Sequence, residues 1–434
     1  MRLKLSHWRE GFWVALGQGI IVLATLYLVK VQARYLEPGD YGRLALALTG
    51  ATLVNQVVMG GLGVAAARYY SIAEERNQLA IFSSSINTLL WRGVRFVALI
   101  GLMALLVGKI MGYGLSTAEL LLASLCFAVL SGLNSVYAGI QNAARLRKMA
   151  ALHGASEAVL KVVCVFLLMS MGGVSGIILL MLGYVLSSGL VFLSHLRFMK
   201  RMGHASIAEN DDLFTFTADL REYAKPFSRF GGFTWAQQSS DRWALEKFYD
   251  LGTVGLYTAL YQLSFSPVSV ATGFLVTLIS PVMFGKSGDG TDDRRVERVR
   301  KLGKNMTVAC LGLTVLVFVL SFYLSRWWLM LFVSGQYLEV ANWLPWLVLM
   351  GGLFATGQVL ALQLMSEMRP AKMTTVKIAT SLLAVVLNVV GSWLDGVAGV
   401  IVAGLMFALV YVSWMAYIVY RPADLIVGVE KKIR

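Results

Sequence analysis

The sequence predicts an all-α membrane protein that crosses the bilayer many times, and three observations support this fold class. Only 14% of its 434 residues are charged, whereas a soluble protein of this length carries about a quarter. Hydrophobic residues make up 57% of the chain, and the mean hydropathy is +0.68. The apolar residues gather into long blocks, many of which reach the roughly 20 residues that a helix needs to span a bilayer.

Twelve apolar blocks are long enough to be transmembrane helices. The first follows a tail with Arg2, Lys4 and Arg9, and it is too long for the apolar region of a signal peptide. The three cysteines lie inside apolar blocks and form no CxxC pair, so the sequence predicts neither a metal site nor a disulfide. The predicted spans are residues 11–33, 42–66, 88–111, 117–142, 154–172, 174–197, 226–248, 253–283, 303–324, 339–365, 373–394 and 397–419.

The basic residues orient these spans, because Lys and Arg favour the cytoplasmic side of a membrane. With the N-terminus inside, 31 of the 38 Lys and Arg residues fall in inner segments and seven in outer segments. We therefore expect both termini in the cytoplasm. The net charge of +14 follows from this topology and indicates no nucleic-acid partner, although the basic loop Lys286–Lys304 suits contact with anionic membrane lipids.

An internal repeat suggests how the spans are organised. Segments 34–48 and 247–261 align without gaps at an offset of 213, with Gly42 matching Gly255. Arg34, Glu37 and Gly39 match Lys247, Asp250 and Gly252 in the same register, and Gly60 matches Gly273. A shared turn signature is the alternative explanation. A duplication predicts two six-helix bundles, residues 1–205 and 206–434, related by a pseudo-two-fold axis along the membrane normal, with a central cleft between them.

Polar side chains inside the spans are the candidates for a substrate site, because such groups are costly in a membrane and usually face a cavity or a partner. Span 4 carries Asn134, Tyr137, Gln141, Arg145 and Lys148 at spacings that place them on one helical face. Several alternatives stay open: snorkelling of the basic residues, a structural Asp241–Arg242 pair, a local Glu157–Lys161 pair and helix-bridging amides. The candidate substrate-binding residues are Lys30, Arg34, Asn55, Gln56, Asn134, Gln141, Arg145, Gln238, Arg242 and Lys377.

These candidates include more cations and amides than acids, so they favour an anionic cargo rich in hydrogen-bonding groups, such as a phosphorylated sugar. Asp241 is the candidate for ion coupling. The four histidines lie at or beyond predicted cytoplasmic span ends, and none is expected to be a metal ligand or a proton relay.

The chain resembles the Wzx-type polysaccharide transporters, which share a superfamily with the multidrug extruders and the lipid II flippases. The resemblance rests on the first outer loop, Arg34-Tyr-Leu-Glu-Pro-Gly-Asp-Tyr-Gly42, and on Lys225-Pro-Phe227, Trp235, Asp241-Arg242 and Gly252-Thr-Val-Gly-Leu-Tyr257 in the second half. It implies a V-shaped fold and transfer of a polyprenyl-pyrophosphate-linked oligosaccharide across a bacterial inner membrane, as in O-antigen and lipopolysaccharide synthesis. The sequence departs from the lipid II flippases, since no two further spans follow Arg421. It departs from the drug extruders, since spans 1 to 4 carry a single acid, Glu119.

The sequence therefore predicts a flippase, not an enzyme, that works by alternating access through a cationic cleft. Its expected partners are the lipid-linked glycan, membrane lipids and polysaccharide assembly proteins. No cofactor is expected, and H⁺ or Na⁺ as a coupling ion stays open. An ion-coupled antiporter of a small organic solute is the alternative transporter. A membrane-embedded sugar-chain polymerase or ligase is the alternative enzyme, and a structural scaffold is the third class.

Overall fold

The computed structural model describes residues 2–112, 114–172, 175–201, 210–265, 293–333, 335–366 and 370–420, together with residues 268, 272 and 283. Helices dominate this part of the chain. The helices before residue 250 are α1 (Arg2–Tyr35), α2 (Pro38–Val54), the π-helix η1 (Asn55–Met59), α3 (Gly60–Glu75), α4 (Leu79–Ile110), α5 (Leu115–Ala143), α6 (Arg147–Met171), α7 (Gly176–Arg201) and α8 (Asn210–Phe248). Those after it are residues 251–265, α10 (Asp293–Phe332), the 3-10 helix η2 (Gly335–Trp343), α11 (Leu344–Ser366) and α12 (Pro370–Tyr420).

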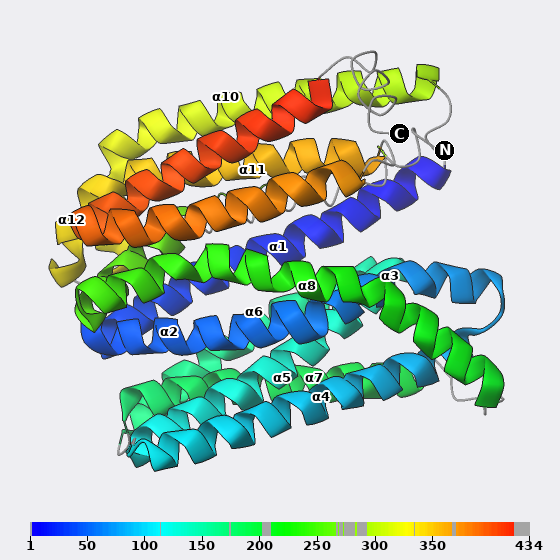
Figure 1. Ribbon diagram of the computed structural model, residues 1–434, viewed down its shortest axis with the longest axis horizontal. Helices are drawn as coiled ribbons and strands as arrows, with labels where there is room; N and C mark the ends of the chain where they lie inside the picture. The colour runs from blue at the N-terminus through cyan, green and yellow to red at the C-terminus, as the bar shows by residue number, and fades with distance from the viewer. Residues whose placement is uncertain are drawn as a thin grey trace, which may run out of the picture. The chain divides into compact units, whose positions relative to one another are not determined.

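The chain divides into two compact units. The first comprises Met1–Ala259 and Phe332–Ser334, and the second comprises Leu260–Leu331 and Gly335–Arg434. In the first unit the long helices α1 to α8 lie side by side (Figure 1), with α6 packed on α1 and α7, and α8 packed on α3 and α4. Helix α8 thus folds within the same unit as the first six predicted spans. The domain boundary between residues 205 and 206, which follows the sequence repeat, stays a prediction.

In the second unit, helix α12 contains a sharp reversal. Asp395 and Gly396 leave the helical conformation, and Gly396 has a φ of 50° that suits glycine. The two arms then pack against each other at Gly391 and Gly399, where a Cβ on either glycine would overlap the carbonyl of the other. The two predicted spans 373–394 and 397–419 are therefore the two arms of α12, joined by a turn at the predicted position.

The apolar helices confirm the predicted fold class of a multi-pass α-helical membrane protein. Within the described part of the chain, nine helices are long and apolar enough to cross a bilayer, and α12 holds two of the predicted spans. Helix α8 is not among them, because polar and charged side chains occur along its whole length. Residues 269–271 and 273–282, in the second half of predicted span 253–283, lie outside the described residues. The number of twelve spans consequently stays a prediction, as does the Gly60–Gly273 match.

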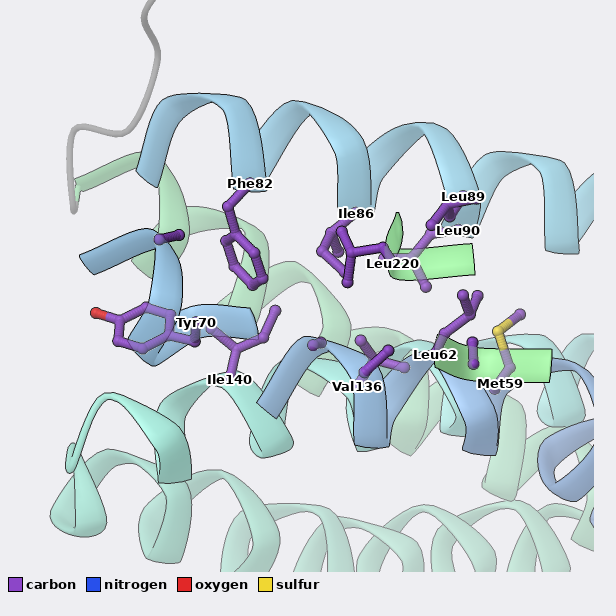
Figure 2. Packing of buried hydrophobic residues seen from close by; sticks show 14 of the residues in the cluster. Met59, Leu62, Tyr70, Phe82, Ile86, Leu89, Leu90, Val136, Ile140 and Leu220 are labelled. Atoms are coloured by element: carbon purple, nitrogen blue, oxygen red, sulfur yellow. The ribbon is translucent and has the colours of Figure 1, made fainter. Parts of the chain in front are cut away.

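A buried apolar cluster holds the first unit together at one end. Figure 2 shows Phe82 and Ile86 of α4 pointing toward Tyr70 of α3 and Ile140 of α5. Leu220 of α8 is completely buried in the same cluster. The side chains come from α3, α4, α5, α8 and the π-helix η1, so the cluster fixes the first part of α8 on the bundle.

The internal repeat is visible in the backbone of two turns. Helix α1 ends at Tyr35 and α8 ends at Phe248, positions that differ by the predicted offset of 213. Leu36 N donates to Gln32 O at 2.8 Å, and Tyr249 N donates to Leu245 O at 2.9 Å, again at that offset. The next helix begins in the same way in both copies. Tyr41 N donates to Glu37 O at 2.9 Å, and Val254 N donates to Asp250 O at 3.2 Å.

The two copies also meet each other reciprocally. A Cβ on Gly42 would overlap the carbonyl of Leu251 and lie 3.2 Å from Gly255 N. A Cβ on Gly255 would overlap the carbonyl of Pro38 and lie 3.1 Å from Gly42 N. Pro38 and Leu251 are equivalent at the offset of 213, so each copy contacts its counterpart through the same surface, as a two-fold axis requires. This Gly42–Gly255 crossing supports a duplication over a shared turn signature alone.

Candidate functional site

The second half of α8 carries a buried ion pair. Asp241 is 6% exposed, and its carboxylate accepts hydrogen bonds from Tyr257 Oη at 2.8 Å and from the Arg242 backbone N at 2.8 Å. The Arg242 guanidinium lies 3.4 Å from Asp241 Oδ1 and donates to Gln238 O at 2.9 Å. A buried carboxylate persists only when charge and hydrogen bonds compensate it, and this one has both. The predicted Asp241–Arg242 pair is therefore present.

The π-helix η1 faces this part of α8. Gln56 Nε2 donates to Gln238 Oε1 at 2.8 Å, and Asn55 Nδ2 donates to Ser131 Oγ of α5 at 2.9 Å. Gly231 lets the backbone of α8 come close to Gln56, because a Cβ there would overlap the Gln56 carbonyl. A single π-helical turn inside an α-helix often marks a functional site. Here it presents two adjacent amides to two different helices.

Two tryptophans of α8 bind the same residue of α2. Trp235 Nε1 donates to Thr49 O at 2.8 Å, and Trp243 Nε1 donates to Thr49 Oγ1 at 2.9 Å. Trp235 and Trp243 are eight residues apart, so they lie on one face of α8. Together with the Gln56–Gln238 bond, they hold the polar half of α8 against α2 and η1.

A polar network runs through the interior of the bundle formed by α5, α6 and α7. Glu157 accepts hydrogen bonds from Ser188 Oγ at 2.9 Å and from Asn134 Nδ2 at 3.3 Å. Lys161 Nζ lies 3.3 Å from Glu157 and 5.6 Å from the centre of the Tyr184 ring. The predicted local Glu157–Lys161 pair is present, but the carboxylate also ties α6 to both neighbouring helices.

Gln141 joins two buried histidines, an arrangement that the sequence reasoning missed. Its amide lies 3.1 Å from His153 Nδ1 and 3.2 Å from His195 Nδ1, and the ring centres are 4.0 Å apart. Ser194 Oγ lies 3.0 Å from His153 Nε2. Gln141, His153 and His195 come from α5, α6 and α7, so no local spacing connects them. Within the described residues, no group of three or more His, Cys, Asp or Glu side chains could hold a metal ion.

Comparison with known proteins decides the family. A family described as polysaccharide biosynthesis protein matches residues 7–285, which is more than half of the chain. The chain belongs to this family. No curated protein sequence matches the chain.

Solved structures show that this polysaccharide biosynthesis protein has the fold of the MOP superfamily. The lipid II flippase MurJ in an inward closed conformation superposes with a TM-score of 0.69 and 16% identity, over 95% of this chain and 88% of that chain. An inward-facing MATE multidrug resistance transporter of the MOP superfamily superposes with a TM-score of 0.68 and 12% identity, over 94% of this chain and 98% of that chain. The Vibrio cholerae MATE transporter VcmN in its bent form superposes with a TM-score of 0.63 and 14% identity, over 97% of this chain and 100% of that chain.

The predicted site residues fall into three groups in this family member. Gln56, Gln238, Asp241 and Arg242 come together on η1 and α8, whereas Asn55, next to Gln56 on η1, bonds to Ser131 of α5. The second group, Asn134 and Gln141, is buried among α5, α6 and α7, where both side chains bridge helices.

The third group consists of the remaining basic residues. Lys30 and Arg34 are exposed near the end of α1, and Lys377 is half-buried on α12 in the second unit.

One expectation about Arg145 is wrong. The stripe from Asn134 to Lys148 assumed a continuous helix, whereas α5 ends at Ala143 and Arg145 has a φ of 56°. Arg145 is therefore in a turn, and Lys148 belongs to α6.

The first half of α8 carries an exposed basic stripe. Arg221, Lys225 and Arg229 recur every four residues and are exposed. Glu222 accepts a hydrogen bond from Lys225, and this ammonium holds the pKa of the Glu222 carboxyl below its ordinary value. Arg221 and Lys225 precede predicted span 226–248, and Arg229 lies in its first turn.

Proposed function

We propose that this protein carries a polyprenyl-pyrophosphate-linked oligosaccharide from the cytoplasmic to the outer leaflet of a bacterial inner membrane, with both termini in the cytoplasm. The observation that supports this most is the polar surface of α8 and η1 around Arg242, where its guanidinium lies beside the amides of Gln238 and Gln56 in a chain rich in apolar helices. Such groups are costly in a membrane unless they serve a substrate or a partner. An arginine and several amides suit a pyrophosphate joined to sugars.

The proposed roles follow from chemistry and exposure. Arg242 binds a phosphate oxygen of the cargo, because its fork of N–H groups matches that geometry. Gln56 and Gln238 accept hydrogen bonds from sugar hydroxyls through their amide oxygens and donate hydrogen bonds to them through their amide nitrogens. Lys30, Arg34, Arg145 and Lys377 remain candidate contacts with the phosphates. Asn134 and Gln141 act through the helices that they bridge, because both are almost completely buried.

Two acids inside the bundle, the buried Asp241 and the half-buried Glu157, are candidates for coupling transport to H⁺ or Na⁺. Asp241 is held by Arg242 and Tyr257, and Glu157 is held by Lys161, Ser188 and Asn134. The oxygens of both carboxylates can accept a proton, and oxygen is the ligand that hard cations such as Na⁺ prefer. These acids also support the second candidate function, antiport of a small organic solute.

Reconstitution into liposomes tests the proposal. A lipid-linked oligosaccharide with a fluorescent label is placed in both leaflets, and its appearance in the outer leaflet is followed with a membrane-impermeant glycosidase or quencher. We expect the whole pool to become accessible in protein-containing liposomes and only the outer half in empty ones. Equal accessible fractions in the two preparations would exclude the flippase function, and export of small cationic dyes without cargo flipping would favour the antiporter.

A further inference from the structure

A cavity of about 350 Å³ opens between α3, α4, α5 and α7 in the first unit. It lies beside the apolar cluster, and Tyr70, Phe82, Ile86 and Ile140, which Figure 2 shows facing one another, form part of its wall. None of the residues predicted to bind substrate lines it. We propose that this cavity binds an uncharged pyranose ring, and that it forms a second site separate from the polar surface of α8 and η1 around Arg242.

The polar groups of the cavity lack protein partners. Ser83, Ser84 and Asn87 of α4 line one side, and the tyrosines Tyr70 and Tyr137 contribute two phenol groups. Among the described residues, none of these five side chains makes a hydrogen bond, although the two tyrosine rings pack on other rings. Tyr70 is 5% exposed, but Asn87 is exposed and the other three side chains are partly exposed, so these polar groups face the open cavity and are available to a ligand. A ligand with several hydroxyl groups would satisfy them.

The rings that border the cavity are held rigidly. Tyr137 stacks on His195 with ring centres 5.7 Å apart and planes 22° apart, and Tyr70 packs edge-on against Phe82 at 5.8 Å. His195 is itself fixed by Gln141 and by its contact with His153. The helices therefore present a preformed wall, which lowers the ordering cost of binding.

The composition of the wall selects the class of ligand. The lining side chains carry no charge, which disfavours phosphates and uronic acids, because an anion there would lose part of its hydration without gaining an oppositely charged partner. An acyl chain would leave the five hydrogen-bonding groups unsatisfied. A neutral pyranose has hydroxyls at its rim and an apolar face, and this combination matches the hydroxyl, amide and aromatic groups of the wall.

This inference rests on the proposed function in one respect, because a sugar-binding cavity in a glycan flippase would receive part of the cargo. The cavity lies where α3 ends and α4 begins, the side that the distribution of Lys and Arg assigns to the cytoplasm. Sugar entering from the cytoplasmic leaflet would meet it first. The pyranose could come from the lipid-linked cargo or from a free glycoside, and the test below separates the two sources.

The direct test is saturation-transfer NMR on the full-length protein in nanodiscs with methyl glycosides of glucose, galactose, mannose, rhamnose and N-acetylglucosamine. We expect saturable binding of at least one of them and none of glucose 1-phosphate. The triple variant Ser83→Ala, Ser84→Ala and Asn87→Ala should weaken that binding about tenfold or more, since it removes three hydrogen-bonding groups. The matched control replaces the exposed Ser135, Ser156 and Asn305 with alanine, and it should bind as the wild type does.

A second pair of variants, Tyr70→Phe and Tyr137→Phe, removes only the hydroxyls and keeps the ring packing, so weaker binding with unchanged thermal stability would locate the sugar in the cavity. The absence of saturable binding to every neutral glycoside, equal binding by the triple variant, or a preference for glucose 1-phosphate would overturn the proposal. If the sugar is part of the cargo, the best glycoside slows flipping by the wild type; binding without this inhibition assigns the cavity to free glycosides. The binding measurement does not depend on transport, so the proposal of a sugar-binding cavity stands even if no flipping is found.

Discussion

Replacement of Gly42 with alanine is expected to destabilise the first unit by about 2 kcal/mol. A Cβ at this position would overlap the backbone carbonyl of Leu251, and a backbone atom cannot move aside as a flexible side chain can. Alanine favours a helix by up to about 1 kcal/mol over glycine, but the overlap outweighs this gain. Gly255→Ala should have a similar effect through Pro38. Thermal unfolding in detergent, followed by tryptophan fluorescence, measures both.

Helix α2 supplies the matched control for this prediction. Gly50 lies on the same helix, and a Cβ there would meet no atom within 4 Å, so Gly50→Ala should leave the melting temperature unchanged or raise it slightly. The double variant of Gly42 and Gly255 should lose less free energy of unfolding than the sum of the two single variants, because both substitutions disrupt the same Gly42–Gly255 crossing. A Gly42→Ala protein as stable as the Gly50→Ala protein would show that the two copies of the repeat do not pack at these glycines.

Replacement of Arg242 with alanine is expected to slow flipping of the lipid-linked oligosaccharide about 10- to 100-fold, because a hydrogen bond to a charged group contributes about 1.5–3 kcal/mol. The change also removes the guanidinium beside Asp241, which would leave a buried carboxylate without its charge partner. Arg242→Lys keeps the charge but loses the paired N–H groups, so it should give an intermediate rate. Initial rates in liposomes measure the effect.

The loss of transport must be separated from a loss of folding. The double variant Asp241→Asn and Arg242→Gln removes both charges and retains groups that can hydrogen-bond, so it should unfold near the wild-type temperature and still flip slowly. Arg326→Ala, at an exposed position of α10, should flip at the wild-type rate. Wild-type flipping by the folded double variant would remove Arg242 from the substrate site.

The sequence could predict the elements whose signal is local. Apolar blocks mark most of the membrane helices, and the turn between residues 394 and 397 falls where the two arms of α12 reverse. The repeat could be predicted because glycine, acid and base recur in one register, and the structure places the matched residues in equivalent turns. The first part of helix α8 was not predicted, because Asn210–Lys225 is polar and carries no hydropathy signal.

The clusters within the bundle depend on contacts between distant helices, which one sequence does not reveal. Gln141 and His195 are 54 residues apart, and Gln56 and Gln238 are 182 apart. Spacing could place Asn134 and Gln141 on one face of α5, but it could not show that this face packs against α6 and α7. The stripe failed at Arg145 because the chain adopts a positive φ there without a glycine to mark the turn.

The most direct test of the account compares two cargoes in the same liposomes. One is an oligosaccharide on polyprenyl pyrophosphate, and the other is the same oligosaccharide on an uncharged polyprenyl ether. If a cationic surface selects an anionic, sugar-bearing lipid, the wild-type protein should flip the pyrophosphate cargo at least tenfold faster, and Arg242→Ala should reduce the difference. Equal rates for the two cargoes, or a rate for the pyrophosphate cargo no higher than in protein-free liposomes, would contradict the account.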